Sequence, residues 1–193
     1  MKKESINKLF SSAKTYKEKF VGMNFVFIYR YDNGILNFKE VKFPAYAFKH
    51  LTGIQADMTS NDFLDACVNQ RLPSSVTEKK NDIAEVKLSV LPTLLNTSSY
   101  RYIGEFMPSG VFIETEALAG NKVACLGIDR EDDAKLYYPK TVLKDDIRKR
   151  VYKPSKIVAI LSKRIEDDSY SITNYLSKDL TLEQIYEVLN NEV

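Results

Sequence analysis

Two short runs of the chain are apolar on both of the faces that a β-strand presents. They are residues 123–128 (Val-Ala-Cys-Leu-Gly-Ile) and residues 157–161 (Ile-Val-Ala-Ile-Leu). A strand of this kind suits the centre of a sheet whose two faces are both covered. The runs therefore predict two central strands, and the other segments have to supply their neighbours and the helices that cover them.

The segments around these runs alternate between helical and strand-like patterns. Residues 6–20 have apolar positions at helical spacing, and strand-like runs at 25–30 and 35–40 then flank Asp32-Asn33-Gly34. Asn-Gly is a strong hairpin signal because both residues of the tight turn need positive φ. Further helices are expected at residues 44–53, from 59 or 60 onward, at about 80–96, at 143–150, and after a capping box at 181–184. Further strands are expected at residues 100–106, 111–115, 136–141 and 170–175.

This order of elements predicts an α+β fold in which helices pack on a mainly antiparallel sheet. The sequence contains no internal repeat and no linker that would divide it, so we expect one domain over residues 1–193. Its core is expected at about residues 40–175. The N-terminal helix and hairpin and the C-terminal helix are interpreted as additions to that core.

The composition limits where the protein works and what it binds. Lys and Arg number 28 against 26 acids, a net charge of +2 that permits nucleic-acid binding, although a dedicated duplex binder is usually more basic. The first residues are charged and amphipathic, unlike a secretory signal, and no apolar run approaches membrane-spanning length. Cys67 and Cys125 lie far apart in apolar surroundings, which is typical of buried free thiols. We therefore expect a cytoplasmic protein without a membrane partner.

Acid–base chemistry near neutral pH would most simply use His50, the only histidine in the chain. Apolar residues surround it, and Gly53 suits the end of a short helix. Lys49, His50 and Thr52 therefore lie together on one anchored piece of backbone. The alternative is a structural or surface histidine, which is the commoner role of a lone histidine.

A second candidate is Lys87, which falls inside the apolar face of the helix predicted near residues 80–96. Steps of 100° per residue place it among Ile83, Val90 and Leu91. A lysine there must extend to solvent, find a buried partner or line a cavity. Alternatively, Pro92 kinks the helix and shifts its phase, which leaves Lys87 at the edge of the face.

Several common catalytic machines have no counterpart in the sequence. It contains no phosphate-binding loop, no dinucleotide fingerprint, no nucleophile elbow and no zinc-ligand spacing. Oxygen ligands for magnesium occur at Asp132-Asp133, Asp145-Asp146 and Asp167-Asp168, but paired acids in turns are usually solvated. We therefore expect neither a metal nor a cofactor.

The candidate side chains left after these exclusions are compatible with metal-free cleavage of RNA. RNA supplies its own nucleophile, the 2′-hydroxyl, so a ribonuclease needs a base, an acid and cations that stabilise the charged transition state. His50, Lys87 and the polar strand end Ser162-Lys163-Arg164 match that requirement. Tyr102, Tyr137 and Tyr138 are candidates for stacking on bases.

Short motifs in a fixed order along the chain resemble a family of nuclease-like domains. They are Phe48-Lys-His-Leu-Thr-Gly53, Ala119-Gly-Asn121 with Ala124-Cys-Leu-Gly127, Tyr137-Tyr-Pro139, Leu143-Lys-Asp-Asp-Ile-Arg-Lys149 and Ile160-Leu-Ser-Lys163. Together they span about residues 25–175. The family they resemble is the fourth phage-type subgroup of the barnase–EndoU–colicin–RelE-like nucleases, which occurs in phages and integrative elements.

The resemblance implies helices followed by a four-stranded antiparallel sheet, and metal-independent RNA cleavage through a 2′,3′-cyclic phosphate. Its histidine motif maps onto His50 and Thr52, and its last strand motif maps onto Ser162 and Lys163. The chain departs from catalysts that use two histidines, because it has only one. The acid would then be Lys163, Lys87, a tyrosine or water.

Two hypotheses of different classes follow. The first is an enzyme: a metal-independent endoribonuclease of a phage or mobile element, a toxin or effector in the cytoplasm of a bacterial host. The predicted catalytic residues are His50, Thr52, Lys87 and Lys163, and the predicted substrate contacts are Lys49, Asn121, Tyr138, Lys144, Arg148 and Ser162.

The second is a non-catalytic binding protein on a nuclease-like scaffold, such as a phage inhibitor of a host defence nuclease. The partner is RNA in the first hypothesis, with an antitoxin as a further protein partner, and the defence nuclease in the second. A structural or virion-associated protein is a third alternative.

Overall fold

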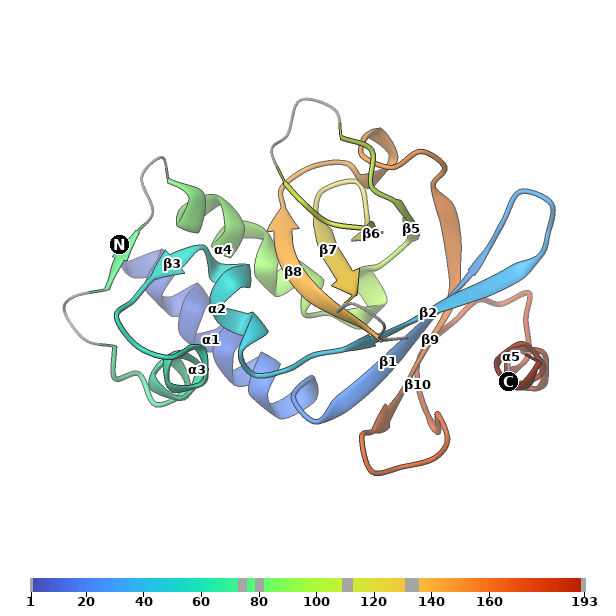
Figure 1. Ribbon diagram of the computed structural model, residues 1–193, viewed down its shortest axis with the longest axis horizontal. Helices are drawn as coiled ribbons and strands as arrows, with labels where there is room; N and C mark the ends of the chain where they lie inside the picture. The colour runs from blue at the N-terminus through green and yellow to red at the C-terminus, as the bar shows by residue number, and fades with distance from the viewer. Residues whose placement is uncertain (1, 73–75, 79–81, 109–112, 131–135, 192–193) are drawn as a thin grey trace.

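The computed structural model describes residues 2–72, 76–78, 82–108, 113–130 and 136–191. Figure 1 shows helices gathered at one end of the molecule and a strongly curved sheet at the other. The gathered helices are α1 (Lys3–Lys19), α2 (Ala47–Thr52), α3 (Ser60–Val68) and α4 (Ile83–Leu94). A fifth helix, α5 (Leu182–Asn190), lies apart from them, and η1 (Thr97–Ser99) and η2 (Ile147–Lys149) are single 3-10 turns.

The main sheet has eight strands in the order β1-β2-β8-β7-β6-β5-β9-β10. They are β1 (Met23–Arg30), β2 (Leu36–Lys42), β5 (Tyr102–Glu105), β6 (Ala117–Gly120), β7 (Cys125–Arg130), β8 (Tyr137–Leu143), β9 (Ser155–Arg164) and β10 (Ile172–Leu176). Because β1 pairs with β9 as well as with β2, seven strands close into a ring and β10 extends it along β9. The β2–β8 junction is one parallel pair, Val41 with Tyr137, and the other ladders of this sheet are antiparallel. A separate two-stranded sheet joins β3 (Ile54–Gln55) and β4 (Thr77–Glu78).

The two faces of the sheet are covered by different helices. The inner face contributes Phe27, Ile103 and Leu126 to the largest core cluster, in which they share burial with Leu9 of α1 and Leu91 of α4. The outer face near β1 and β9 packs against α5 through Val26, Ile28 and Ile185. Alternate residues of β1 therefore serve two cores, which explains why residues 23–30 read as an almost continuous apolar run.

The predicted α+β fold is confirmed, with helices on a mainly antiparallel sheet and added terminal helices. The two runs that are apolar on both faces form β7 and β9, and β9 lies between β1 on one edge and β5 and β10 on the other. The capping box at Thr181 and Gln184 is also present at the start of α5. The sheet has eight strands, where the resemblance implied four.

Several local predictions are wrong for identifiable reasons. In the first hairpin only Gly34 takes a positive φ (85°), and the backbone N–H of Gly34 donates to the carbonyl of Tyr31 at 2.9 Å. The connection is thus a longer turn with a glycine bulge instead of a two-residue turn. Residues 113–115 are not a strand, and β5 pairs with β6, whose Ala-Leu-Ala-Gly sequence lacks the β-branched residues that signal strands. Residues 111 and 112 of that predicted strand lie outside the described residues. The helix expected at 143–150 is reduced to the single turn η2.

The apolar face of α4 is rotated relative to the prediction. Ile83 and Val86 are exposed at 39% and 45%, whereas Leu88 and Leu91 are buried. The helix presents Leu88 and Leu91 to the core, and Ile83 instead covers Gly53 at the end of α2. This rotation moves Lys87 toward the side of the helix that meets α2 and β8.

Candidate functional site

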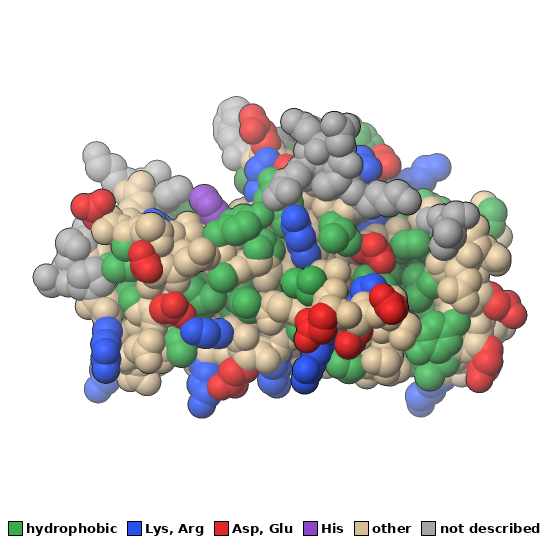
Figure 2. Space-filling model, turned by 60° about the horizontal axis from the view of Figure 1, so that its bottom comes forward, with side chains coloured by type: hydrophobic (Ala, Val, Ile, Leu, Met, Phe, Trp, Pro, Cys, Tyr) green, Lys and Arg blue, Asp and Glu red, His purple; other side chains and the backbone are tan. Residues whose placement is uncertain are grey.

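The predicted catalytic histidine lies at the surface beside a cleft between α2, the residues after it, α4 and β8. His50 is exposed, and Figure 2 shows the histidine side chain (purple) reaching the surface. The cleft has a volume of about 670 Å³ and is lined by Lys49, His50, Gly53, Ile54, Gln55, Ala56, Asp57, Ser60, Lys87 and Lys140. We call it the α2 cleft. Three lysines and one histidine face one aspartate there, so its charge suits an anionic ligand.

Helix α2 holds this site because one of its faces and its C-terminal end are fixed. Phe48 and Leu51 are fully buried, which anchors one face of the short helix to the core. Gly53 ends the helix in the left-handed region with a φ of 71°. The hydroxyl of Thr52 is buried, donates to the carbonyl of Lys49 at 2.8 Å and accepts from the N–H of Ile54 at 3.2 Å. The Thr52 hydroxyl is thus occupied within the last turn of α2, two residues after His50.

Lys87 connects the cleft to two other elements. Its Nζ donates to the carbonyl of His50 at 3.0 Å and to the hydroxyl of Thr141 in β8 at 2.9 Å. Its aliphatic stem lies over Gly53, where a Cβ would stand 3.0 Å from the Lys87 Cδ. Both predicted roles of this lysine, a partner within the protein and a place in a cavity wall, are therefore observed together.

The other two lysines of the cleft also hold parts of its wall. The ammonium group of Lys49 donates to the carbonyls of Ala56 and Met58, each at 2.8 Å, and so folds the chain after β3 back onto α2. Lys140 of β8 pairs with Asp129 of β7. This hydrogen bond is the main cause that raises the pKa of Lys140, so the side chain stays charged at neutral pH.

The two predicted residues of β9 lie outside this cleft. The ammonium group of Lys163 donates to the carbonyl of Asp168 at 3.1 Å and lies 4.9 Å from the ring centroid of Tyr170. Tyr170 belongs to the outer-face cluster that α5 covers. Ser162 is buried and accepts a hydrogen bond from Asn174 at 2.8 Å. The described lining of the α2 cleft contains neither residue, so the structure does not bring the end of β9 to His50.

Of the remaining predicted contacts, Asn121, Lys144 and Arg148 lie near η2, whereas Tyr138 lies at the other end of the β7–β8 ladder, opposite Asp129. Asn121 shapes the β6–β7 turn, where its side chain accepts from the N–H groups of Val123 and Ala124. Arg148 pairs with Asp146, and this arginine is the main cause that lowers the pKa of Asp146 to about 2. Lys144 is exposed next to this corner, and Tyr138 is half-buried on β8.

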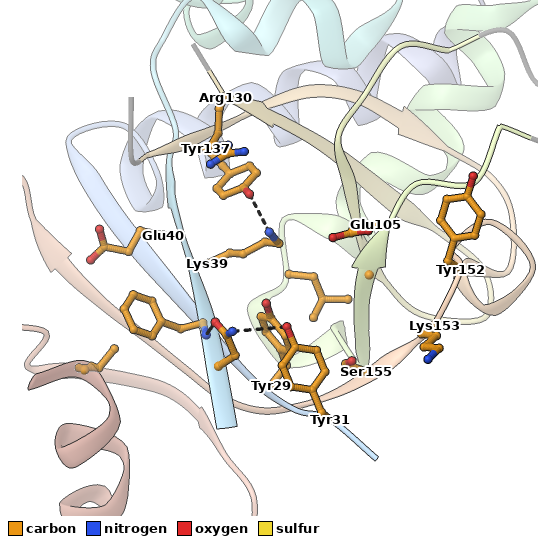
Figure 3. Close-up of a pocket in the computed structure, with 15 residues that line it drawn as sticks. Tyr29, Tyr31, Lys39, Glu40, Glu105, Arg130, Tyr137, Tyr152, Lys153 and Ser155 are labelled. Atoms are coloured by element: carbon orange, nitrogen blue, oxygen red, sulfur yellow. Dashed lines mark hydrogen bonds between the residues drawn. The ribbon is translucent and has the colours of Figure 1, made fainter. Parts of the chain in front are cut away.

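Sequence reasoning missed two features. Lys140 lines the α2 cleft because β8 has an irregular register around Pro139, which no pattern in the sequence indicated. A second and larger cavity, of about 800 Å³, opens between β2 and β5 and is lined by several tyrosines (Figure 3). Of the tyrosines predicted to stack on bases, only Tyr137 is among the lining residues described for this cavity.

In the described ranges no three His, Cys, Asp or Glu side chains gather as a metal-binding group. Asp145 and Asp146 pair with Arg150 and Arg148, and Asp132 and Asp133 lie outside the described residues. No helix in the described part of the chain is both long enough and apolar enough to cross a membrane.

Comparison with known proteins identifies the family. Neither the curated proteins nor the solved structures contain a match to the chain. One family model, described as phage-Barnase-EndoU-ColicinE5/D-RelE like nuclease4, matches residues 8–179. The match includes most of α1, the whole main sheet and the α2 cleft, and it ends before α5. The chain therefore belongs to the phage-Barnase-EndoU-ColicinE5/D-RelE like nuclease family.

Proposed function

We propose that this nuclease-like domain cleaves RNA at the α2 cleft, with the 2′-hydroxyl of the substrate as the nucleophile. The observation that carries the proposal is the exposed His50 at the edge of a cleft lined by three lysines. A histidine is the side chain whose ordinary pKa lies closest to neutrality, and lysines attract the phosphate backbone.

The chemistry assigns a separate role to each group. His50 takes the proton of the 2′-hydroxyl while the 2′-oxygen attacks the phosphorus, and the bond from phosphorus to the 5′-oxygen breaks. Water in the open cleft gives a proton to the leaving 5′-oxygen, and the products are a 2′,3′-cyclic phosphate and a 5′-hydroxyl. Lys87 and Lys140 stabilise the negative charge that builds up on the phosphate oxygens. The raised pKa of Lys140 makes it a poor proton donor, which favours an electrostatic role.

The test compares His50→Ala with Gln55→Ala on a labelled single-stranded RNA, with a chelator and with Mg²⁺. Gln55 is an exposed residue of the same cleft that has no proton to exchange near neutral pH, so it is the matched control. The expected loss is about 10²-fold or more in cleavage rate for His50→Ala and little for Gln55→Ala. A substrate with deoxyribose at the cleaved position should resist the wild-type protein.

Two results would refute the assignment. Cleavage at the wild-type rate by His50→Ala would show that this histidine is not the base in the reaction. Cleavage of the deoxyribose substrate at the same rate as RNA would remove the 2′-hydroxyl as the nucleophile. Wild-type protein that leaves tRNA, rRNA and mRNA intact under both metal conditions would contradict the enzyme class.

A second function is favoured by one specific observation. The ammonium groups of Lys49, Lys87 and Lys140 all bond to oxygens of the protein itself. This arrangement supports a scaffold that binds a protein partner, such as a host defence nuclease, without catalysis. Under this alternative, the wild-type protein cleaves no RNA and inhibits the partner nuclease, and His50→Ala inhibits it equally well.

The biological setting proposed for the enzyme is a toxin or effector of a phage or mobile element. Its expression in a bacterial host should arrest growth and degrade RNA, and His50→Ala should do neither at equal protein level. Growth arrest by both proteins to the same extent would separate toxicity from RNA cleavage.

A further inference from the structure

The larger cavity lies between β2 and β5, extends to Leu189 of α5, and is distinct from the α2 cleft. Strand β1 runs from Phe25, which packs on Phe20 after α1, to Tyr29 in the cavity wall. The cavity therefore opens at the end of the strands that the N-terminal helices leave uncovered. Its volume of about 800 Å³ is within the range typical of small-molecule sites.

Aromatic rings dominate the wall of this cavity. Tyr29 and Tyr31 line it from the end of β1, Tyr137 from β8, and Tyr152 from the segment before β9. The rings of Tyr29 and Tyr31 meet edge to face at a centroid distance of 5.5 Å. Tyr31 and Tyr152 are exposed at 40% and 64%, so ring surface is accessible to a planar ligand.

Charged groups of both signs accompany the rings. Lys39 donates to the hydroxyl of Tyr137 at 2.6 Å, and its Nζ lies 4.4 Å from the centroid of that ring. Figure 3 shows the Glu105 carboxylate extending into the cavity from the side of β5, opposite Lys39 on β2. Arg130 also lies over Tyr137, but its guanidinium is already paired with Glu116. The cavity thus offers a cation and a carboxylate on opposite walls, with aromatic rings around them.

This combination excludes two simple classes of ligand. An apolar ligand would leave the ammonium of Lys39 and the carboxylate of Glu105 without compensation for lost water. An isolated phosphate would find Lys39 and Lys153 in the lining, but it would be repelled by Glu105 and would make no use of the rings. A flat heterocycle that carries both donors and acceptors can pair with Lys39 and Glu105 and stack on the rings.

We propose that this cavity binds one unpaired nucleobase, stacked on tyrosine and oriented by Glu105 and Lys39. The carboxylate accepts from an amino group of the base, and the ammonium donates to a ring nitrogen or a carbonyl oxygen. Adenine, cytosine and guanine offer the carboxylate an exocyclic amino group beside a ring acceptor, whereas the ring N3–H of uracil lies between two carbonyl oxygens that repel a carboxylate, so the cavity disfavours uracil.

Strand β8 connects this cavity with the α2 cleft. Tyr137 lines the cavity and Lys140 lines the cleft. Three steps along a strand span ~10 Å, since each residue advances about 3.3 Å. A single-stranded RNA whose backbone lies in the cleft can therefore place a neighbouring base among the tyrosines. This part of the inference, that the base belongs to an RNA strand, rests on the proposed function.

The test measures binding of AMP, CMP and UMP to the full chain by NMR chemical-shift titration. The variants are Tyr31→Ala, Tyr152→Ala and Glu105→Ala, all at exposed positions, and the control is Tyr46→Ala, an exposed tyrosine outside the cavity. AMP is expected to bind more tightly than UMP, by about five-fold or more. At least one of the two tyrosine variants should lower the affinity for AMP by about five-fold or more, in keeping with the strength of base–aromatic stacking. Glu105→Ala should bring the affinities for AMP and UMP together, and Tyr46→Ala should change neither.

Two outcomes would overturn the cavity assignment. One is AMP affinity that stays unchanged in both Tyr31→Ala and Tyr152→Ala, and the other is UMP that binds wild-type protein as tightly as AMP and CMP. The assignment is separable from cleavage, because His50→Ala should bind AMP normally. If wild-type protein binds AMP as expected but cuts no RNA, the proposed function fails and the cavity stands. If it cuts RNA but binds no mononucleotide, the cavity assignment fails alone.

Discussion

The ammonium group of Lys87 donates to the backbone of His50 in α2 and to the side chain of Thr141 in β8. The sequence predicted that this lysine would extend to solvent, find a buried partner or line a cavity if it fell inside the apolar face, or lie at the edge of that face if Pro92 shifted the phase. It did not identify the partners, since neither a backbone carbonyl nor a threonine leaves a distinctive pattern. The same limit applies to Lys140, which reaches the cleft through an irregularity in β8.

The two cysteines allow a prediction about single residues. Burial raises the pKa of the Cys67 thiol to about 12, and burial likewise raises that of Cys125 to about 12, with a further contribution from Asp145. The reactive thiolate is therefore scarce below pH 9 in the folded protein. We expect at least 10²-fold slower labelling by iodoacetamide at pH 8 in native protein than in urea. Mass spectrometry of peptides measures the labelling of each cysteine. Fast labelling of either cysteine in native protein would contradict its buried placement.

At the scale of elements, the end of α2 depends on a glycine for two separate reasons. Gly53 has a φ of 71°, and a Cβ there would meet Lys87 Cδ at 3.0 Å and Ile83 Cγ2 at 3.2 Å. Gly34 has a similar φ of 85°, but a Cβ built on it would meet no atom within 4 Å. Gly34→Ala should cost about 1–2 kcal/mol of unfolding free energy from backbone strain alone. Gly53→Ala should cost more, because it also displaces Lys87.

Urea denaturation of both glycine variants measures the difference. A loss for Gly53→Ala that equals the loss for Gly34→Ala would mean that Lys87 moves aside without cost. In that case the bonds from Lys87 to His50 and Thr141 contribute little to holding α2 in place.

The elements themselves were largely predictable, and the reasons are local. Helix α3 is capped by Thr59, whose side chain accepts from the N–H of Asp62, and α5 begins with a capping box. A few adjacent residues therefore determine where each of these helices begins. Strand β6 and the rotation of α4 were not predictable, because tertiary burial decides them. Residues 117–120 are all buried although their sequence has little strand preference. His50 and Lys87, which the sequence singled out, both line the α2 cleft, whereas the tyrosine-lined cavity joins segments that only the closed sheet brings together.

At the scale of the whole molecule, α5 lies beyond the residues that the family model matches, yet it covers the outer face of the sheet. Ile185 is fully buried against this face, while Ile172 on β10 is 45% exposed. Ile185→Ala should lower the unfolding free energy by about 2–4 kcal/mol, and Ile172→Ala by much less. Thermal or urea unfolding checks both values. Equal small losses would mean that α5 is a dispensable addition to the family fold.

The pairing of β1 with β9 joins Met23 to Arg164, residues near opposite ends of the chain. While the protein is being synthesised, β1 and β2 leave the ribosome long before the strand that completes them. Contacts so distant in sequence form late and slow the folding of the chain. Until then one edge of β1 stays open, with Val26 and Ile28 uncovered, and an edge of this kind tends to associate with other chains. A copy that stops short of β9 is consequently expected to be insoluble, because the sheet can close only after β9 has been synthesised.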